Sequence, residues 1–105
     1  MIRLTILYPY KEGARFDLKY YCDVHISLAK EKMGDALIGA EVERGLNSGA
    51  PGTPPHFFAI GHLYFESMET FNKAFPPASA ALGADVANYT DVTPVVQLAE
   101  VVLDW

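Results

Sequence analysis

Residues 16–34 read FDLKYYCDVHISLAKEKMG and predict a single amphipathic helix, against which the rest of the chain is expected to pack. Asp17 is a suitable N-cap, because its carboxylate can accept hydrogen bonds from the free N–H groups of the first turn. Phe16 and Tyr21 have the spacing of a hydrophobic staple, and Gly34 supplies a C-terminal stop. Apolar side chains recur at steps of three and four along one face, with His25 among them. The apolar members of this face are Leu18, Tyr21, Cys22, Ala29 and Met33.

His25 is the unusual residue of this face, since a buried polar group without a partner costs about 1–3 kcal/mol. Two interpretations are open. His25 is either a core histidine bonded to a nearby carbonyl or to Tyr21, or a group that lines a pocket and transfers protons. An imidazole with an ordinary pKa of about 6.5 suits proton transfer near neutral pH. Tyr21 either orients the imidazole and donates to a carbonyl, or only packs on Phe16.

The chain has 105 residues and a net charge of −5, with no basic run. This length predicts a single domain over residues 1–105, and the acidic balance argues against nucleic acid or an anionic membrane as partner. The single cysteine, Cys22, excludes an internal disulfide and suits a cytoplasmic protein, and no secretory or transmembrane segment is evident. His56 and His62 would lie about 20 Å apart along one strand, too far to share a metal. We expect neither a metal nor a cofactor, because no ligand-spacing or nucleotide motif is present.

The expected elements follow one another as strand, helix, strand, strand, helix, strand. The strands are predicted at residues 2–8, 36–46, 56–65 and 92–103, and Gly61 inside the third indicates a bend or a close approach by another group. A second helix begins after Ser67 and is expected to break at Pro76 and Pro77, followed by a short helical turn at 78–84 and an irregular link at 85–91. This order predicts an α+β fold, the ferredoxin-like βαββαβ arrangement with a four-stranded antiparallel sheet.

Both helices are expected on one face of that sheet, which leaves the other face bare. Apolar residues expected there include Leu7, Leu37, Phe57, Leu63, Phe65, Val95, Val101 and Leu103. Because a monomer rarely exposes so much apolar surface, the sequence predicts a homodimer in which two sheets pack face to face.

Several segments together resemble the EthD family, which is named after a protein needed for bacterial breakdown of ethyl tert-butyl ether. They are Phe16-Asp17 with Tyr20-Tyr21 and His25, Gly34-Asp35-Ala36-Leu37, Gly61-His62-Leu63-Tyr64-Phe65 and Asn88-Tyr89-Thr90-Asp91. The resemblance implies a dimeric α+β barrel, and it places the family's helix histidine at His25 and its aromatic residue at Tyr21. Members of that superfamily include cofactor-free isomerases, polyketide cyclases, quinone-forming monooxygenases and haem-degrading enzymes. Many of them bind a flat or cyclic organic molecule between sheet and helices.

The predicted site has His25 and Tyr21 as catalytic residues. The residues predicted to line the pocket are His62, Tyr64, Asp85 and Tyr89. His62 points either into the pocket or into the dimer seam, and Asp85 and Tyr89 either serve the site or form turns. The expected function is a cofactor-independent isomerase, cyclase or lyase that acts on a small cyclic or aromatic catabolic intermediate, with His25 as acid/base. The alternatives are a non-catalytic binding or accessory protein for a hydrophobic metabolite, and a dimerisation module whose pocket is filled by side chains.

Overall fold

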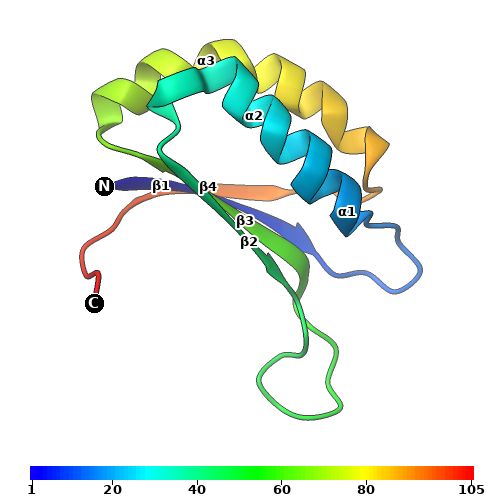
Figure 1. The fold of residues 1–105 in the computed structure, drawn as a ribbon. Helices are drawn as coiled ribbons and strands as arrows, with labels where there is room; N and C mark the ends of the chain where they lie inside the picture. Colours follow the sequence, from blue (N-terminus) through cyan, green and yellow to red (C-terminus); the bar gives the residue numbers. More distant parts are fainter.

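The computed structural model describes residues 1–105 as a four-stranded antiparallel sheet covered on one face by helices (Figure 1). The strands are β1 (Ile2–Pro9), β2 (Gly39–Arg44), β3 (Phe57–Phe65) and β4 (Val95–Glu100), and their order across the sheet is β2-β3-β1-β4. Strand β1 pairs with both β3 and β4, so that Leu4 lies opposite Leu63 on one side and Leu98 on the other. This is the predicted ferredoxin-like α+β fold.

The first helix begins and ends where the sequence predicts. It comprises α1 (Leu18–Tyr20), a π turn (Tyr21–His25) and α2 (Ile26–Met33). The Asp17 carboxylate caps it by accepting from the Tyr20 N–H at 3.0 Å. Gly34 ends it with φ +58°, a conformation that glycine adopts without strain.

The π turn changes the phase of this helix. Its wider ring is closed by a bond from the Ile26 N–H to the Tyr21 carbonyl, five residues back. The buried residues consequently recur at every fourth position, which a regular 3.6-residue turn would rotate away from the core. They are Tyr21, His25, Ala29 and Met33. Cys22, predicted to be buried, is exposed instead.

Helix α3 (Met68–Asp85) passes through Pro76 and Pro77, so the predicted break is wrong. Both prolines are exposed, and so are the residues whose carbonyls lose a hydrogen bond, Asn72 and Lys73. Water can satisfy these carbonyls. Continuing the helix brings Ala78 and Leu82 into the core, against the sheet and α2, and this burial offsets the lost bonds.

The prediction for the bare face of the sheet is wrong for three residues, because Leu37, Leu63 and Phe65 lie in the core under the helices. Alternation along β1 and β3 places Thr5 and His62 on the opposite face. That face therefore mixes polar and apolar groups. It carries Arg3, Thr5, Leu7, Ile60, His62 and Tyr64 from the two central strands.

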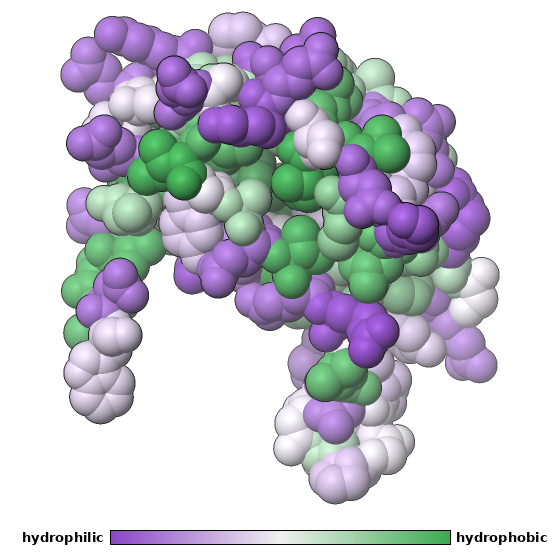
Figure 2. All heavy atoms as spheres, viewed as in Figure 1, coloured by the Kyte–Doolittle hydropathy of each residue, from purple (hydrophilic) through white to green (hydrophobic).

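Two segments project beyond the sheet on the side away from the helices (Figures 1 and 2). One is the loop between β2 and β3, and the other is the chain after β4. Both carry strongly exposed apolar side chains, among them Leu46 at 75%, Leu103 at 80% and Trp105. Figure 2 shows a recess between the two projections. None of the helices has the length and apolar character needed to cross a membrane.

Candidate active site

A cavity of about 160 Å³ lies between the helices and the sheet, at the side of β1 and β4. Side chains from β1, the first helix, β3, α3 and the start of β4 line it. Most are apolar, and they include Ile6, Ile26, Ala29, Leu63, Phe75 and Leu82. The polar groups in the lining are Tyr8, Tyr21, His25 and Ser79. The cavity is thus an apolar space with a single imidazole in its wall.

His25 is held in this wall by a hydrogen bond to Asp85 at the end of α3. The distance from Nδ1 to the Asp85 Oδ2 is 2.9 Å, and both side chains are close to 90% buried. A carboxylate only accepts hydrogen bonds, so Nδ1 carries the proton and donates it. The other ring nitrogen, Nε2, has no hydrogen-bond partner in the protein. The neutral imidazole therefore keeps a free lone pair on Nε2.

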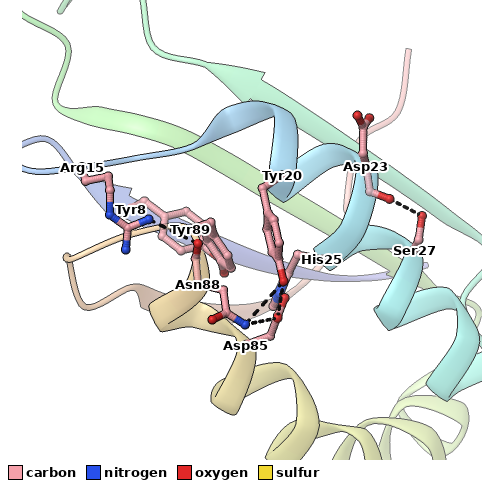
Figure 3. A network of polar contacts seen from close by, with 9 residues as sticks. All are labelled: Tyr8, Arg15, Tyr20, Asp23, His25, Ser27, Asp85, Asn88 and Tyr89. Atoms are coloured by element: carbon pink, nitrogen blue, oxygen red, sulfur yellow. Dashed lines mark hydrogen bonds and ion pairs between the residues drawn. The ribbon is translucent and has the colours of Figure 1, made fainter.

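Two further donors converge on the same carboxylate (Figure 3). The Tyr20 hydroxyl donates to Asp85 Oδ1 at 2.7 Å, and the Asn88 amide nitrogen donates to it at 2.8 Å. Burial alone would raise the pKa of Asp85, but the hydrogen bonds from Tyr20, Asn88 and His25 together lower it below its usual range. Asp85 is therefore ionised at neutral pH and fixes both the orientation and the tautomer of His25.

Two buried tyrosines, Tyr21 and Tyr89, contact the imidazole, and a third, Tyr8, packs against both of them. Tyr21 stacks on His25 with ring centroids 5.4 Å apart and planes at 20°, and the Tyr89 ring lies 4.8 Å from it. The hydroxyls of Tyr8 and Tyr89 share a hydrogen bond of 2.7 Å. Burial is the main cause that raises the pKa of all three side chains. Their hydroxyls stay protonated and can serve as donors but not as bases.

Gly61 makes room for Tyr21. A Cβ atom built on Gly61 would overlap the Tyr21 hydroxyl oxygen and would lie 3.2 Å from its Cζ. The glycine predicted to mark a close approach does so, and the approaching group is the tyrosine that stacks on His25. The π turn that carries both residues is a feature often found at functional sites.

The structure brings four of the six predicted site residues together and separates the other two. His25 and Tyr21 line the cavity, Asp85 bonds His25, and Tyr89 packs against it. His62 and Tyr64 lie on the opposite face of the sheet and do not reach the cavity. There His62 bonds Thr5 through Nδ1 at 3.1 Å and Glu43 through Nε2 at 2.7 Å, and Tyr64 donates to Glu41.

The sequence prediction missed Tyr8, Tyr20 and Asn88. Tyr8 follows Ile2, Leu4 and Ile6 on the inner face of β1, and a tyrosine in such a run signals a buried hydroxyl that needs a partner. Tyr20 and Asn88 carry no comparable signal. They are 68 residues apart, and only the packing of the first helix against the end of α3 brings them to one carboxylate.

Comparisons with known proteins agree with the fold. The EthD domain profile matches residues 14–93. An uncharacterised 11.0 kDa protein from the thcB–thcC intergenic region of Rhodococcus erythropolis is 33% identical over 91 residues, which cover 85% of this chain and 84% of that protein.

Among solved structures, an EthD-like protein from Ralstonia eutropha JMP134 is 43% identical, with a TM-score of 0.92 over 99% of this chain and 94% of that one. A protein from Bacillus halodurans C-125 that is described as a member of the EthD family is 22% identical, with a TM-score of 0.70 over 95% of this chain and 97% of that one. More distant structures with a ferredoxin-like fold are described as dimeric. The match over most of its length shows that this chain belongs to the EthD family.

Proposed function

We propose that this protein binds a small cyclic organic molecule in the cavity and catalyses the transfer of a proton from one atom of that molecule to another. His25 acts as the general base and then as the general acid. The observation that supports this most is the free Nε2 of His25 in the wall of an apolar cavity, with Nδ1 held by an ionised carboxylate. The same arrangement of histidine and aspartate activates the base in hydrolytic enzymes. No cofactor is required for such a step.

The proposed reaction is an isomerisation through an enol. Nε2 removes a proton from the carbon beside a carbonyl, and the electron pair of that C–H bond forms the carbon–carbon double bond of the enolate. The carbonyl electrons move to oxygen, where a protonated tyrosine hydroxyl can stabilise the charge; Tyr8 and Tyr21 both line the cavity. The imidazolium, stabilised by Asp85, then returns the proton to a different carbon.

A non-catalytic binding protein is the second candidate, because most of the cavity wall is apolar and would hold a hydrophobic metabolite without chemistry. The Asp85 cluster favours catalysis over binding alone. A binding wall has no need of a buried carboxylate that receives bonds from His25, Tyr20 and Asn88. Such clusters are typical of sites that tune a proton-transfer group.

Deuterium exchange tests the catalytic proposal. We expect the protein to accelerate the incorporation of deuterium from D₂O at the carbons beside the carbonyl of cyclohexanone by about 10²-fold or more over buffer. Proton NMR measures the rate of this exchange. His25→Gln should reduce this to nearly the background rate, and Tyr21→Phe should reduce it in part. The matched control is His56→Gln, which alters an exposed histidine outside the cavity.

Equal exchange by the wild type and His25→Gln would contradict the assignment of His25. Saturable binding of cyclohexanone by the wild type without any accelerated exchange would instead support the binding protein.

We also infer that the protein is a homodimer through the sheet face opposite the helices. The two projections and this face carry exposed apolar residues that a single chain leaves in water, including Leu46, Val95 and Leu103. The recess between the projections suits the sheet of a second copy (Figure 2). Related ferredoxin-like structures described as dimeric support a homodimer.

Sedimentation at micromolar concentration should give about twice the chain mass of 11.6 kDa. Val95→Glu should shift the equilibrium toward the monomer, because it places a charge on the proposed interface. Val24→Glu is the control, since Val24 is 44% exposed on the first helix, away from that face. A wild-type monomer, or equal effects of the two substitutions, would refute the interface.

A further inference from the structure

The cavity beside His25 offers no positively charged lysine or arginine to a ligand. Nothing in its lining therefore balances a carboxylate or phosphate. The nearest fixed charge on the His25 side is the ionised Asp85 carboxylate, directly behind the imidazole. An anionic ligand would lose its hydration in an apolar wall and would face a negative charge at short range.

The cavity is also small. Its volume of about 160 Å³ is close to that of an apolar cavity of about 150 Å³ that accepts one benzene molecule. Large side chains limit its extension, since Phe75 and Leu82 come from α3 and Leu63 from the sheet. The cavity is open on one side, so a ligand of two fused rings would leave part of its second ring outside these walls.

We propose that the ligand is an uncharged molecule of one-ring size that carries a single hydroxyl or carbonyl oxygen, and that carboxylates and phosphate esters are excluded. This inference rests on the proposed function, since it describes what His25 acts on. The ligand's one oxygen finds its partners among His25 and the protonated tyrosines, while its ring fills the apolar space. Acidic lactones and other carboxylated intermediates do not fit this site.

Titrations of the protein with phenol, benzoate and 1-naphthol at pH 8 test the inference. Binding is measured by calorimetry and by changes in the NMR signals of the His25 ring. Phenol should bind saturably and shift the His25 signals. Benzoate and 1-naphthol should each bind at least ten-fold more weakly than phenol, the first because of its charge and the second because of its size.

Ser79 offers a way to reverse the charge preference, because it is the half-buried polar residue of α3 in the cavity lining. Ser79→Lys should strengthen benzoate binding at least ten-fold, whereas Ser79→Gln, of similar length but uncharged, should not. Equal gains for both variants would overturn the charge argument.

The outcomes separate this inference from the proposed function. Benzoate binding as tight as phenol binding, with the His25 signals shifted, would overturn the inference and leave the acid/base role intact. Phenol preferred over benzoate without any change at His25 would support the neutral cavity and refute the role of His25. Absence of saturable phenol binding would also overturn the inference.

Discussion

Gly61→Ala should destabilise the protein by about 3 kcal/mol and abolish ligand binding beside His25, an expected result of overpacking at a rigid contact. The new methyl group would occupy the position of the Tyr21 hydroxyl oxygen. Tyr21 cannot turn aside easily, because it is 1% exposed and packs against Tyr8, Phe16 and Tyr89. Any shift of its ring also moves the surface on which His25 stacks.

The reason for this effect can be tested by restoring the lost space. Tyr21→Phe removes the hydroxyl, and the remaining ring carbon would lie 3.2 Å from the new Cβ, a contact that a small adjustment relieves. The double variant should therefore be more stable than Gly61→Ala alone, by about 1–2 kcal/mol. Gly39→Ala is the matched control in the same sheet, where the new Cβ would make only ordinary contacts with Tyr64.

Urea unfolding of the wild type, the two single variants and the double variant gives the coupling energy, and the Gly39→Ala control is unfolded in the same way. If Tyr21→Phe and Gly61→Ala add without rescue, or if Gly39→Ala costs as much as Gly61→Ala, the steric explanation fails.

The fold could be predicted from the sequence because its signals are local. Asp17 and Gly34 mark the ends of the first helix through interactions within a few residues, and the alternation in residues 2–8 identifies β1. The order of elements then allows few topologies. The π turn has no such signal, since it depends on packing Tyr21 and His25 against the sheet, and this is why Cys22 was assigned to the wrong side.

Two other errors arise where the local sequence does not determine the structure. Pro76 and Pro77 would end an isolated helix, but the core contacts of Ala78 and Leu82 keep α3 intact. The faces of β3 were misjudged at Leu63 because a strand that is apolar on both sides carries no sequence signal for which side meets the helices.

The candidate site could be predicted only in part, because some of its contacts join residues that are far apart in the sequence. His25 and Tyr21 stand one turn apart on an apolar helix face, and this local pattern identifies them. The partner of His25 is Asp85, 60 residues away, and no local pattern joins the two. His62 was predicted to line the pocket or to face the dimer seam, and the parity of β3 places it on the face of the sheet away from the cavity.

Asp85→Asn should reduce the proposed proton transfer by roughly 10²–10⁴-fold while the fold is retained. An amide of the same shape can still accept from Tyr20 through its oxygen, but its NH₂ group would then face Nδ1 of His25. Nδ1 must then accept, so the ring proton moves to Nε2 and the lone pair is lost from the cavity side. Nitrogen NMR of the His25 ring distinguishes the two tautomers directly.

The same substitution should lower the free energy of unfolding at pH 7 by about 2 kcal/mol, because a buried, ionised acceptor of three hydrogen bonds is lost. The native pKa of Asp85 lies below its ordinary value, so the carboxylate stabilises the native state fully above about pH 4. This contribution disappears as the pH falls through the native pKa, where the carboxylate is protonated.

The difference in stability between wild type and Asp85→Asn should therefore be large at pH 7 and shrink steadily below pH 4. Asp23→Asn supplies the control, because Asp23 is an exposed carboxylate on the first helix whose side chain pairs only with Lys19 at the surface. It should change stability by less than about 0.5 kcal/mol. A stability difference for Asp85→Asn that is independent of pH would mean that the charge of Asp85 does not act in the folded state. The tautomer of His25 would then need another cause.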